Sequence, residues 1–280
     1  MRYRTLLVHL DNEHRVERPL RYARALAGGQ EAHLIGLTVL PSFTEIPPSE
    51  MGTQMLMDEI RASFKNEAAR MQSVFEAKAP AQTFTTEWRV ADPGFKHPME
   101  AVAEASQGAD IIVASQDDPD WQKAGFSDRA GLLVALAPRP VIFVPVSGWP
   151  LHVPGRVLVA WNGSREAARA LFDALPLLQA AKSVTVLSVR AVDNRECPFI
   201  AKQDVDVCET LARHGIKAEW VCEAPSQDDA GLTLLTQVER HAADLLVMGG
   251  YGHSRVRERI FGGVTRHILR HMRTPVLMSH

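Results

Sequence analysis

The sequence predicts an α/β protein of two tandem domains, each a parallel sheet covered by helices on both faces. Short apolar runs rich in Val, Ile and Leu alternate with helical stretches along the chain. These runs are continuous rather than alternating in polarity, which is typical of strands buried on both faces of a parallel sheet. The pattern also occurs twice, because the two halves of the chain resemble each other.

Three pairs of segments carry this repeat, in the same order in each half. The pairs are Arg4–Ala27 with Arg156–Leu178, Gly108–Ser115 with Ala242–Gly249, and Arg139–Val146 with Thr274–His280. The stretch Ser147–Gly155 between the halves is rich in Pro and Gly and is expected to be a linker. We therefore expect a first domain over 1–146, a linker over 147–155 and a second domain over 156–280.

The elements of the second half follow from its apolar periodicity. The expected strands are Arg156–Trp161, Ser183–Val189, Ile216–Cys222, Asp244–Gly249 and Pro275–Ser279. The expected helices are Arg165–Ala180, Ala201–His214, Asp229–His241 and Gly263–Met272. Right-handed crossovers between such strands give a doubly wound sheet. The first half repeats the scheme with a longer second crossover, 41–80, much of it strongly helical.

Composition excludes several classes of partner. The formal net charge of the 280 residues is −2, so no global field favours nucleic acid or an anionic membrane, and an anion site must be local. No apolar run approaches the roughly 18 residues of a membrane span, and the first run is broken by His9 and Asp11, unlike a secretory signal. The cysteines Cys197, Cys208 and Cys222 are odd in number and lack CxxC spacing, which predicts reduced thiols and a cytoplasmic protein.

One glycine-rich stretch, MGGYGHSRVRERIFGGVTRHIL at Met248–Leu269, lies between an expected strand and the last expected helix. Gly249 ends the strand, and Gly252 allows close backbone approach or a positive φ. Gly262 and Gly263 open the helix, whose free N–H groups and positive dipole end favour an anion. The stretch either wraps an anion or forms a tight turn. It has no Gly-Lys-Ser/Thr, so it is not a P-loop.

This stretch and VLVAWNGSREAARAL, at Val157–Leu171, resemble the universal stress protein family, and the repeat resembles its two-domain members. Nucleotide-binding members carry Gly-x-x-Gly, nine residues, then Gly and a Ser or Thr. Gly249, Gly252 and Gly262 match that pattern, whereas Gly263 replaces the hydroxyl residue. The resemblance implies a flavodoxin-like (adenine nucleotide alpha hydrolase-like) fold with strand order 3-2-1-4-5. It places ATP across the ends of strands one and four.

The resemblance implies an adenine nucleotide site in the second half and none in the first. The expected ATP-binding residues are Asn162, Val189, Met248, Gly249, Gly252, Gly262, Gly263, Val264 and Thr265. The residues expected to screen the negative charge of the phosphates are His253, Ser254 and Arg255, with Arg257 and Arg259 further along the loop. The expected ligand is ATP, ADP or AMP, with or without Mg, and no protein metal site is expected.

Several of these residues have a second interpretation. Asn162 stands where the family has an acid and can bind a ribose or adenine edge, or it forms a turn with Ser164 as helix N-cap. Val189 contacts adenine or belongs to the core. His267 and His271 have the i, i+4 spacing of zinc ligands but lack a third ligand, and histidine also suits a helix C-terminus.

The first half has lost the glycine motif. Only Gly125 and Gly131 remain after the corresponding strand, and Asp117, Asp118 and Asp120 gather at its end. Three carboxylates there repel a triphosphate. They either hold a divalent cation or are solvated turn acids. The first half is therefore expected to be structural or to bind something else.

The leading functional hypothesis is an ATP-binding regulatory protein of the stress response with one site in the second half. The alternatives are a protein-interaction scaffold whose glycine stretch is a relic, and a slow ATPase in which His253 is the candidate base. Binding is favoured over catalysis. The last strands of the halves, Val141–Val146 and Val276–Ser279, are expected to pair with each other, and the chain to form a homodimer.

Overall fold

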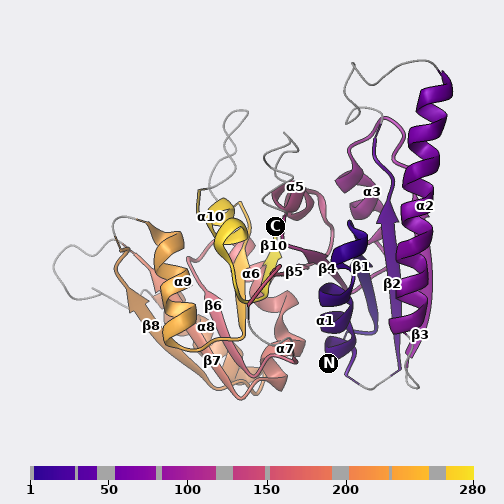
Figure 1. Cartoon of the computed structure of the whole chain (residues 1–280). Coiled ribbons are helices and arrows are strands. Elements are labelled where there is room, and N and C mark those ends of the chain that lie inside the picture. The colour runs from indigo at the N-terminus through magenta and orange to yellow at the C-terminus, as the bar shows by residue number, and fades with distance from the viewer. Residues whose placement is uncertain are drawn as a thin grey trace. The chain divides into compact units, whose positions relative to one another are not determined.

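The computed structural model describes residues 3–28, 31–42, 54–79, 84–117, 129–148, 152–190, 202–226, 229–251 and 263–280 (Figure 1). The chain divides into two compact units, Tyr3–Val146 and Ser147–His280. Each unit has its own sheet strands and its own helices, so each is described separately.

The first unit contains five parallel strands in the order β3-β2-β1-β4-β5. The strands are β1 (Thr5–His9), β2 (Ala32–Val39), β3 (Phe84–Ala91), β4 (Ile111–Ser115) and β5 (Val141–Val144). The helices are η1 (Glu13–Arg15), α1 (Glu17–Ala27), α2 (Gln54–Lys78), α3 (Pro98–Ala105) and α5 (Arg129–Leu136). The long α2 lies in the crossover that the sequence predicted to be helical.

The second unit repeats this arrangement with the order β8-β7-β6-β9-β10. Its strands are β6 (Arg156–Ala160), β7 (Ser183–Val189), β8 (Ala218–Glu223), β9 (Leu245–Gly249) and β10 (Val276–Ser279). Its helices are α6 (Arg165–Asp173), α7 (Leu175–Ala180), α8 (Lys202–Arg213), α9 (Ala230–Arg240) and α10 (Gly263–His271). Counted within each unit, both orders are 3-2-1-4-5, which confirms the predicted fold class.

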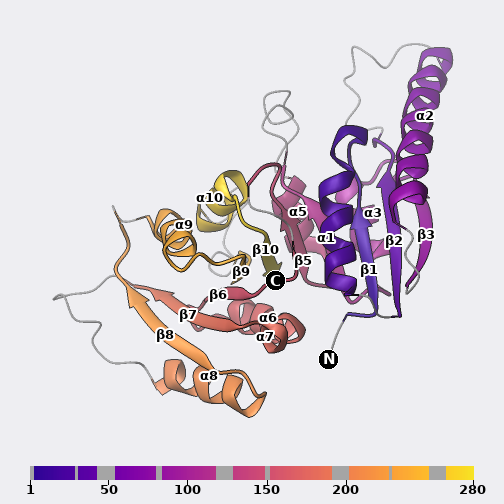
Figure 2. The ribbon, with the colours of Figure 1, turned by 60° about the horizontal axis from the view of Figure 1, so that its bottom comes forward.

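Helices cover both faces of each sheet. In the second unit α9 and α10 lie on one face and α6, α7 and α8 on the other (Figure 2). The Val, Leu and Ile side chains of the central strands β1, β4, β6 and β9 are consequently almost completely inaccessible. Burial on both faces explains why these strands are continuous apolar runs in the sequence.

One structural detail repeats in both units and supports their common design. The Asp110 carboxylate accepts hydrogen bonds from the backbone N–H groups of Arg4 and Thr5, at 2.6 and 2.9 Å. The Asp244 carboxylate likewise accepts from Gly155 and Arg156, with Oδ1 at 2.9 and 2.8 Å from the two nitrogens. In each unit an aspartate just before the fourth strand therefore anchors the start of the first strand.

Two expectations are wrong in this part of the chain. The single helix expected over Arg165–Ala180 is broken at Ala174 into α6 and α7. Pro176 has no N–H, and its ring clashes with a carbonyl one turn earlier, so a helix cannot run through it. The expected strand Ile216–Cys222 is displaced to β8, Ala218–Glu223, and Ile216 is a buried residue just ahead of it.

The expectation of three reduced thiols is also wrong, because Cys222 on β8 is disulfide-bonded. Cys208 on α8 is not part of a disulfide, and Cys197 lies outside the described residues. Disulfides are uncommon in a reducing cytosol. The cysteines therefore do not support the expected cytoplasmic location. No helix in the described ranges has the length and hydropathy needed to cross a membrane.

Candidate functional site

A cavity of about 330 Å³ lies at the carboxyl ends of β6, β7 and β9 in the second unit. Its lining includes the last residue of each of these strands, Ala160, Val189 and Gly249. The direction of the strand order changes between β6 and β9, and open parallel sheets bind ligands at such a point. The volume lies within the range of roughly 300–1,000 Å³ that is typical of small-molecule sites.

The structure brings together the expected nucleotide-binding residues that it describes. All of them line this cavity: Asn162, Val189, Met248, Gly249, Gly263, Val264 and Thr265. They come from β6, β7, β9 and α10, which are far apart in the sequence. The other expected residues, Gly252, His253, Ser254, Arg255 and Gly262, lie outside the described residues.

The segment after β6 forms the turn that the sequence left as an alternative. Asn162 Oδ1 accepts a hydrogen bond from the Ser164 backbone N at 3.0 Å, and Gly163 has a φ of 73°. Ser164 Oγ accepts from the Ala167 backbone N at 3.1 Å and so caps α6. Asn162 nevertheless lines the cavity with an exposed side chain, and its amide NH₂ group is a donor that a ligand can use.

The two glycines at the ends of the stretch serve different purposes. A Cβ atom at Gly249 would lie 2.5 Å from the Ala167 backbone N and 2.6 Å from the Glu166 carbonyl carbon. Glycine is therefore required there because β9 runs directly against the first turn of α6. A Cβ atom at Gly263 would have no atom of the described part of the chain within 4 Å. Packing does not explain the glycine at Gly263, and a serine side chain has room there.

The hydroxyl of Thr265 faces the glycine stretch from the first turn of α10. Thr265 is buried, and its Oγ1 lies 3.4 Å from the Tyr251 backbone N, longer than a normal hydrogen bond. Tyr251 has a φ of 58°, a left-handed conformation that is unusual for a residue other than glycine. A strained backbone conformation persists only where the surrounding structure fixes it. Such residues are frequent at ligand sites and switch regions.

Three helices of the second unit begin near the cavity, and two of them are capped by their own side chains. Ser164 caps α6, and Asp229 Oδ1 accepts from the N–H groups of Gly231 and Leu232 at 2.8 and 3.1 Å at the start of α9. The Leu232 N–H, as the largest cause, lowers the pKa of Asp229. By contrast, α10 begins with Gly263, and the residue before it in the sequence is also a glycine, so neither has a side chain that could cap the helix. An anion is therefore favoured at α10 rather than at α6 or α9.

The described contacts of His267 and His271 are made within α10 and to Asp229. The rings of His267 and His271 lie 4.4 Å apart, but His271 Nδ1 is 2.9 Å from the His267 carbonyl oxygen and so is used within the helix. His267 Nδ1 lies 3.5 Å from Asp229 Oδ2. Within the described ranges, no group of three or more His, Cys, Asp and Glu residues is placed to hold a metal ion.

Sequence reasoning missed two aromatic residues of the lining, Trp161 and Tyr251. Both are adjacent to motif residues, since Trp161 precedes Asn162 and Tyr251 lies inside the first glycine pair. The apolar wall completed by Leu187 and Leu234 was also missed, because ordinary core positions give the same pattern. Among the described lining residues, none is a carboxylic acid, histidine, lysine, arginine or cysteine.

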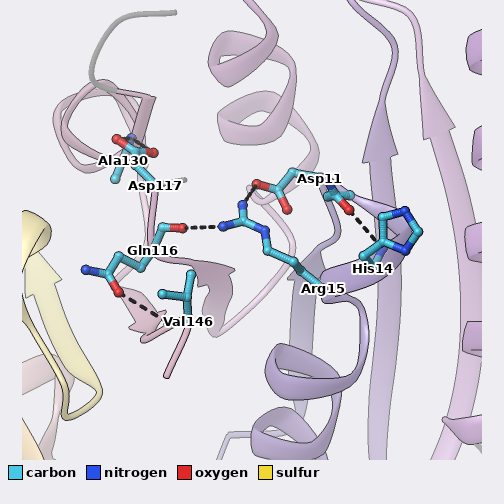
Figure 3. Close-up of polar contacts among 8 residues, drawn as sticks. Asp11, His14, Arg15, Gln116, Asp117, Ala130 and Val146 are labelled. Atoms are coloured by element: carbon cyan, nitrogen blue, oxygen red, sulfur yellow. Dashed lines mark hydrogen bonds and ion pairs between the residues drawn. The ribbon is translucent and has the colours of Figure 1, made fainter. Parts of the chain in front are cut away.

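The corresponding edge of the first unit is filled by the protein's own charged groups. Arg15 Nη2 lies 2.8 Å from Asp11 Oδ2, and both side chains are largely buried. Arg15 Nη1 also donates to the Gln116 carbonyl oxygen at 3.2 Å, which connects the segment after β1 to the segment after β4 (Figure 3). Gln116 Oε1 in turn accepts from the Val146 backbone N at 3.2 Å.

Asp117 occupies the helix start in this unit. Its two carboxylate oxygens lie 3.1 and 3.3 Å from the Ala130 backbone N, at the first turn of α5 (Figure 3). Asp117 is thus a helix cap, neither of the two roles expected for it, while Asp118 and Asp120 lie outside the described residues. In the second unit the equivalent helix is α10, which begins with Gly263. The first unit therefore places a carboxylate where the second offers N–H groups.

A larger cavity, of about 480 Å³, lies at the opposite edge of the second unit. It is lined by residues at the starts of β9 and β10 and at the ends of α9 and α10, among them Leu246, Val276, Glu239 and His271. Helix C-termini carry a partial negative charge and disfavour anions. The smaller cavity, at the carboxyl ends of the strands, is consequently the stronger candidate for a phosphate ligand.

The sequence of the second half matches a known family. Residues 155–280 match the model of the universal stress protein family. A universal stress protein of Synechocystis sp. is 28% identical over 146 residues, which cover 52% of this chain. The chain spans about half of that relative, 48% of its length.

Solved structures resemble the whole chain. A universal stress protein from Archaeoglobus fulgidus matches with a TM-score of 0.72 and 18% identity, over 98% of this chain and 95% of that one. A protein of unknown function from Pseudomonas aeruginosa matches with a TM-score of 0.61 and 16% identity, over 99% and 92%. At these identities the likeness concerns the fold. The match to the family model covers residues 155–280, the half that contains the cavity.

Proposed function

We propose that the second unit binds an adenine nucleotide and that the chain acts as a nucleotide-binding regulatory protein of the universal stress type. The main observation that supports this proposal is the cavity at the carboxyl ends of β6, β7 and β9. Every expected ATP-binding residue that the structure describes lines it. Its walls include apolar side chains suited to a nucleobase, and the start of α10 suits a phosphate. No other ligand class explains both features as directly.

The proposal assigns one nucleotide to each chain. In the first unit, Asp117 caps α5 at the position equivalent to the start of α10, and the Asp11–Arg15 ion pair neutralises its own charge there. A triphosphate would have to displace the Asp117 carboxylate and would be repelled by it. We therefore assign a structural role to the first unit.

Two alternatives remain from the sequence. A scaffold with a relic site is favoured by Gly263, since a family hydroxyl is missing where space for it exists. A slow ATPase is weaker, because the described lining contains no acid or histidine that can act as a general base, and His253 lies outside the described residues.

We extend the proposal from the matched half to the whole chain. It consists of two tandem domains of the universal stress type, with Mg accompanying the phosphates of ATP or ADP. The last strand of each half pairs with that of the other, and two chains form a homodimer. These features rest on the sequence repeat and on the family resemblance.

Titration calorimetry of the full chain with ATP, ADP and AMP tests the proposal. We expect saturable binding with a stoichiometry of one nucleotide per chain. Native mass spectrometry of the purified protein shows in parallel whether a nucleotide is retained. Binding of two nucleotides per chain contradicts the assignment of the first unit, and binding of none favours the relic scaffold.

A further inference from the structure

Trp161 lies at a fixed point of the candidate site. It follows β6 directly and is one of the residues that line the cavity. Its backbone N donates to the Leu187 carbonyl oxygen at 2.8 Å, and its carbonyl oxygen accepts from Ser188 Oγ at 2.6 Å. Ser188 is completely buried. These two hydrogen bonds connect the backbone of Trp161 to β7, so the backbone that carries the indole is held in a fixed position.

The indole carries a polar group for which the described part of the chain supplies no partner. Its Nε1 is buried and has no hydrogen-bond acceptor among the described residues. A buried donor without an acceptor is unfavourable, and indole N–H groups usually find a partner. The N–H bond lies in the plane of the ring, so a base that stacks on the indole would leave the N–H group as it is. The face of the indole is therefore the part that a flat ring in the cavity can use.

The cavity has two chemically different ends. In the sheet, β6 lies between β7 and β9. Trp161 is bonded to the β7 side, where Leu187 and Val189 also line the cavity. Gly249 and the start of α10 lie on the β9 side. Leu187 and Val189 are therefore separated by the width of β6 from the end that offers helix N–H groups.

We infer that Trp161 makes the site selective for compounds with a flat ring by stacking on the base of the nucleotide, with the phosphates directed toward α10. The inference rests on the proposed function, because it names the part of the ligand that one wall recognises. Stacking on an aromatic side chain tolerates different bases, so Trp161 favours nucleotides over phosphate compounds without a ring.

Three variants of the full chain separate the contributions of the indole. Trp161→Leu removes the aromatic face, whereas Trp161→Phe keeps a face and removes the N–H group. We expect Trp161→Leu to weaken ATP binding by about 5-fold to 100-fold. Its affinity for inorganic tripolyphosphate stays within about twofold of the wild type. Trp220→Leu is the matched control, since Trp220 is also half-buried, lies on β8 and does not line the cavity.

Tryptophan fluorescence gives a second readout that does not depend on the stability of Trp161→Leu. ATP should quench part of the wild-type emission, and Trp161→Phe should lose that quenching while it still binds ATP. Wild-type ATP affinity in Trp161→Leu, or unchanged quenching in Trp161→Phe, overturns the inference and leaves the proposed function intact. If the wild type itself binds no ATP, the proposed function fails, and the inference fails with it.

Discussion

Gly263 is the residue at which this chain departs from the nucleotide-binding pattern, and the structure leaves room to restore it. A Cβ atom at Gly263 meets no atom of the described residues within 4 Å. We expect Gly263→Ser to strengthen ATP binding by about twofold to tenfold, because one added hydrogen bond is worth about 0.5–1.5 kcal/mol. Calorimetric titration of the variant and the wild type measures the difference.

Gly263→Ala is the control for this prediction. It adds a Cβ atom and lowers the entropy of the unfolded chain without supplying a hydroxyl. The account requires that only serine improves affinity. Equal gains from alanine and serine would assign the effect to the backbone, and no gain from serine would show that position 263 does not face the phosphates.

His9, the last residue of β1, makes the stability of the first unit depend on pH. Burial, as the largest cause, lowers its pKa from 6.5 to about 4, and Asp11 opposes this shift while Arg129 and Arg15 add to it. Between these values the unfolded chain binds a proton that the folded chain does not. The free energy of unfolding should therefore fall by about 3 kcal/mol as the pH falls from 6.5 to 4.

Denaturant unfolding of the full chain at several pH values between 4 and 7 measures this slope. His9→Gln cannot take up the proton, so its stability should change less with pH than that of the wild type over the same range. The comparison uses the difference in slope, because the substitution also changes packing. Parallel slopes in the two proteins would show that His9 is protonated equally in the folded and unfolded states.

Among the elements, β9 and α6 approach each other closely beside the cavity. Gly249 allows it, since a Cβ atom there would lie 2.5 Å from the Ala167 backbone N. We expect Gly249→Ala to lower the free energy of unfolding by about 1–3 kcal/mol, because strand and helix must separate. Urea denaturation measures the loss. Gly263→Ala is the matched control and should change stability little; equal effects of the two substitutions would contradict the packing argument.

Elements were predictable from the sequence where one local rule dominated. The buried strands β1, β4, β6 and β9 were found because burial on both faces leaves continuous apolar runs. The break between α6 and α7 was missed, although Pro176 marks it. The cap that Asp117 gives to α5 was not predictable in the same way. It joins residues 13 positions apart across a segment whose path the sequence does not specify.

The part of the candidate site that belongs to the glycine motif and to the turn after β6 was predictable from the sequence. Glycine spacing located Gly249 and Gly263, and the turn rule located Asn162 and Ser164. Trp161 and Leu187 reach the same cavity from different strands, β6 and β7. Apolar and aromatic residues at strand ends are common in any core, so only the three-dimensional arrangement separates cavity walls from packing.

At the scale of the whole molecule, the two units have the same strand order but differ at the carboxyl ends of their strands. Asp110 and Asp244 anchor the first strand of each unit in the same way, whereas Asp117 and Gly263 give the equivalent helix starts opposite properties. Such a pattern is expected when one of two repeated domains keeps a binding site and the other keeps only the scaffold.

The sequence also predicts that the last strands of the two halves pair with each other. β5 and β10 are short and buried, and they are apolar except for Ser279. If they pair, their backbone amides should exchange with solvent slowly, at rates similar to those of the central strands β1 and β6. Hydrogen-exchange mass spectrometry of the full chain measures these rates. Fast exchange along Val141–Val144 and Val276–Ser279 would show that the two edges are unpaired.

The central claim is that a nucleotide binds the second unit and not the first. Hydrogen exchange of the full chain with and without saturating ATP tests it most directly, because it locates the bound ligand along the sequence. The account predicts protection at Met248–Tyr251 and Gly263–Thr265. It predicts no change at Asp11–Arg15 or Gln116–Asp117. Protection of the first-unit segments, or no protection anywhere at saturating ATP, would contradict it.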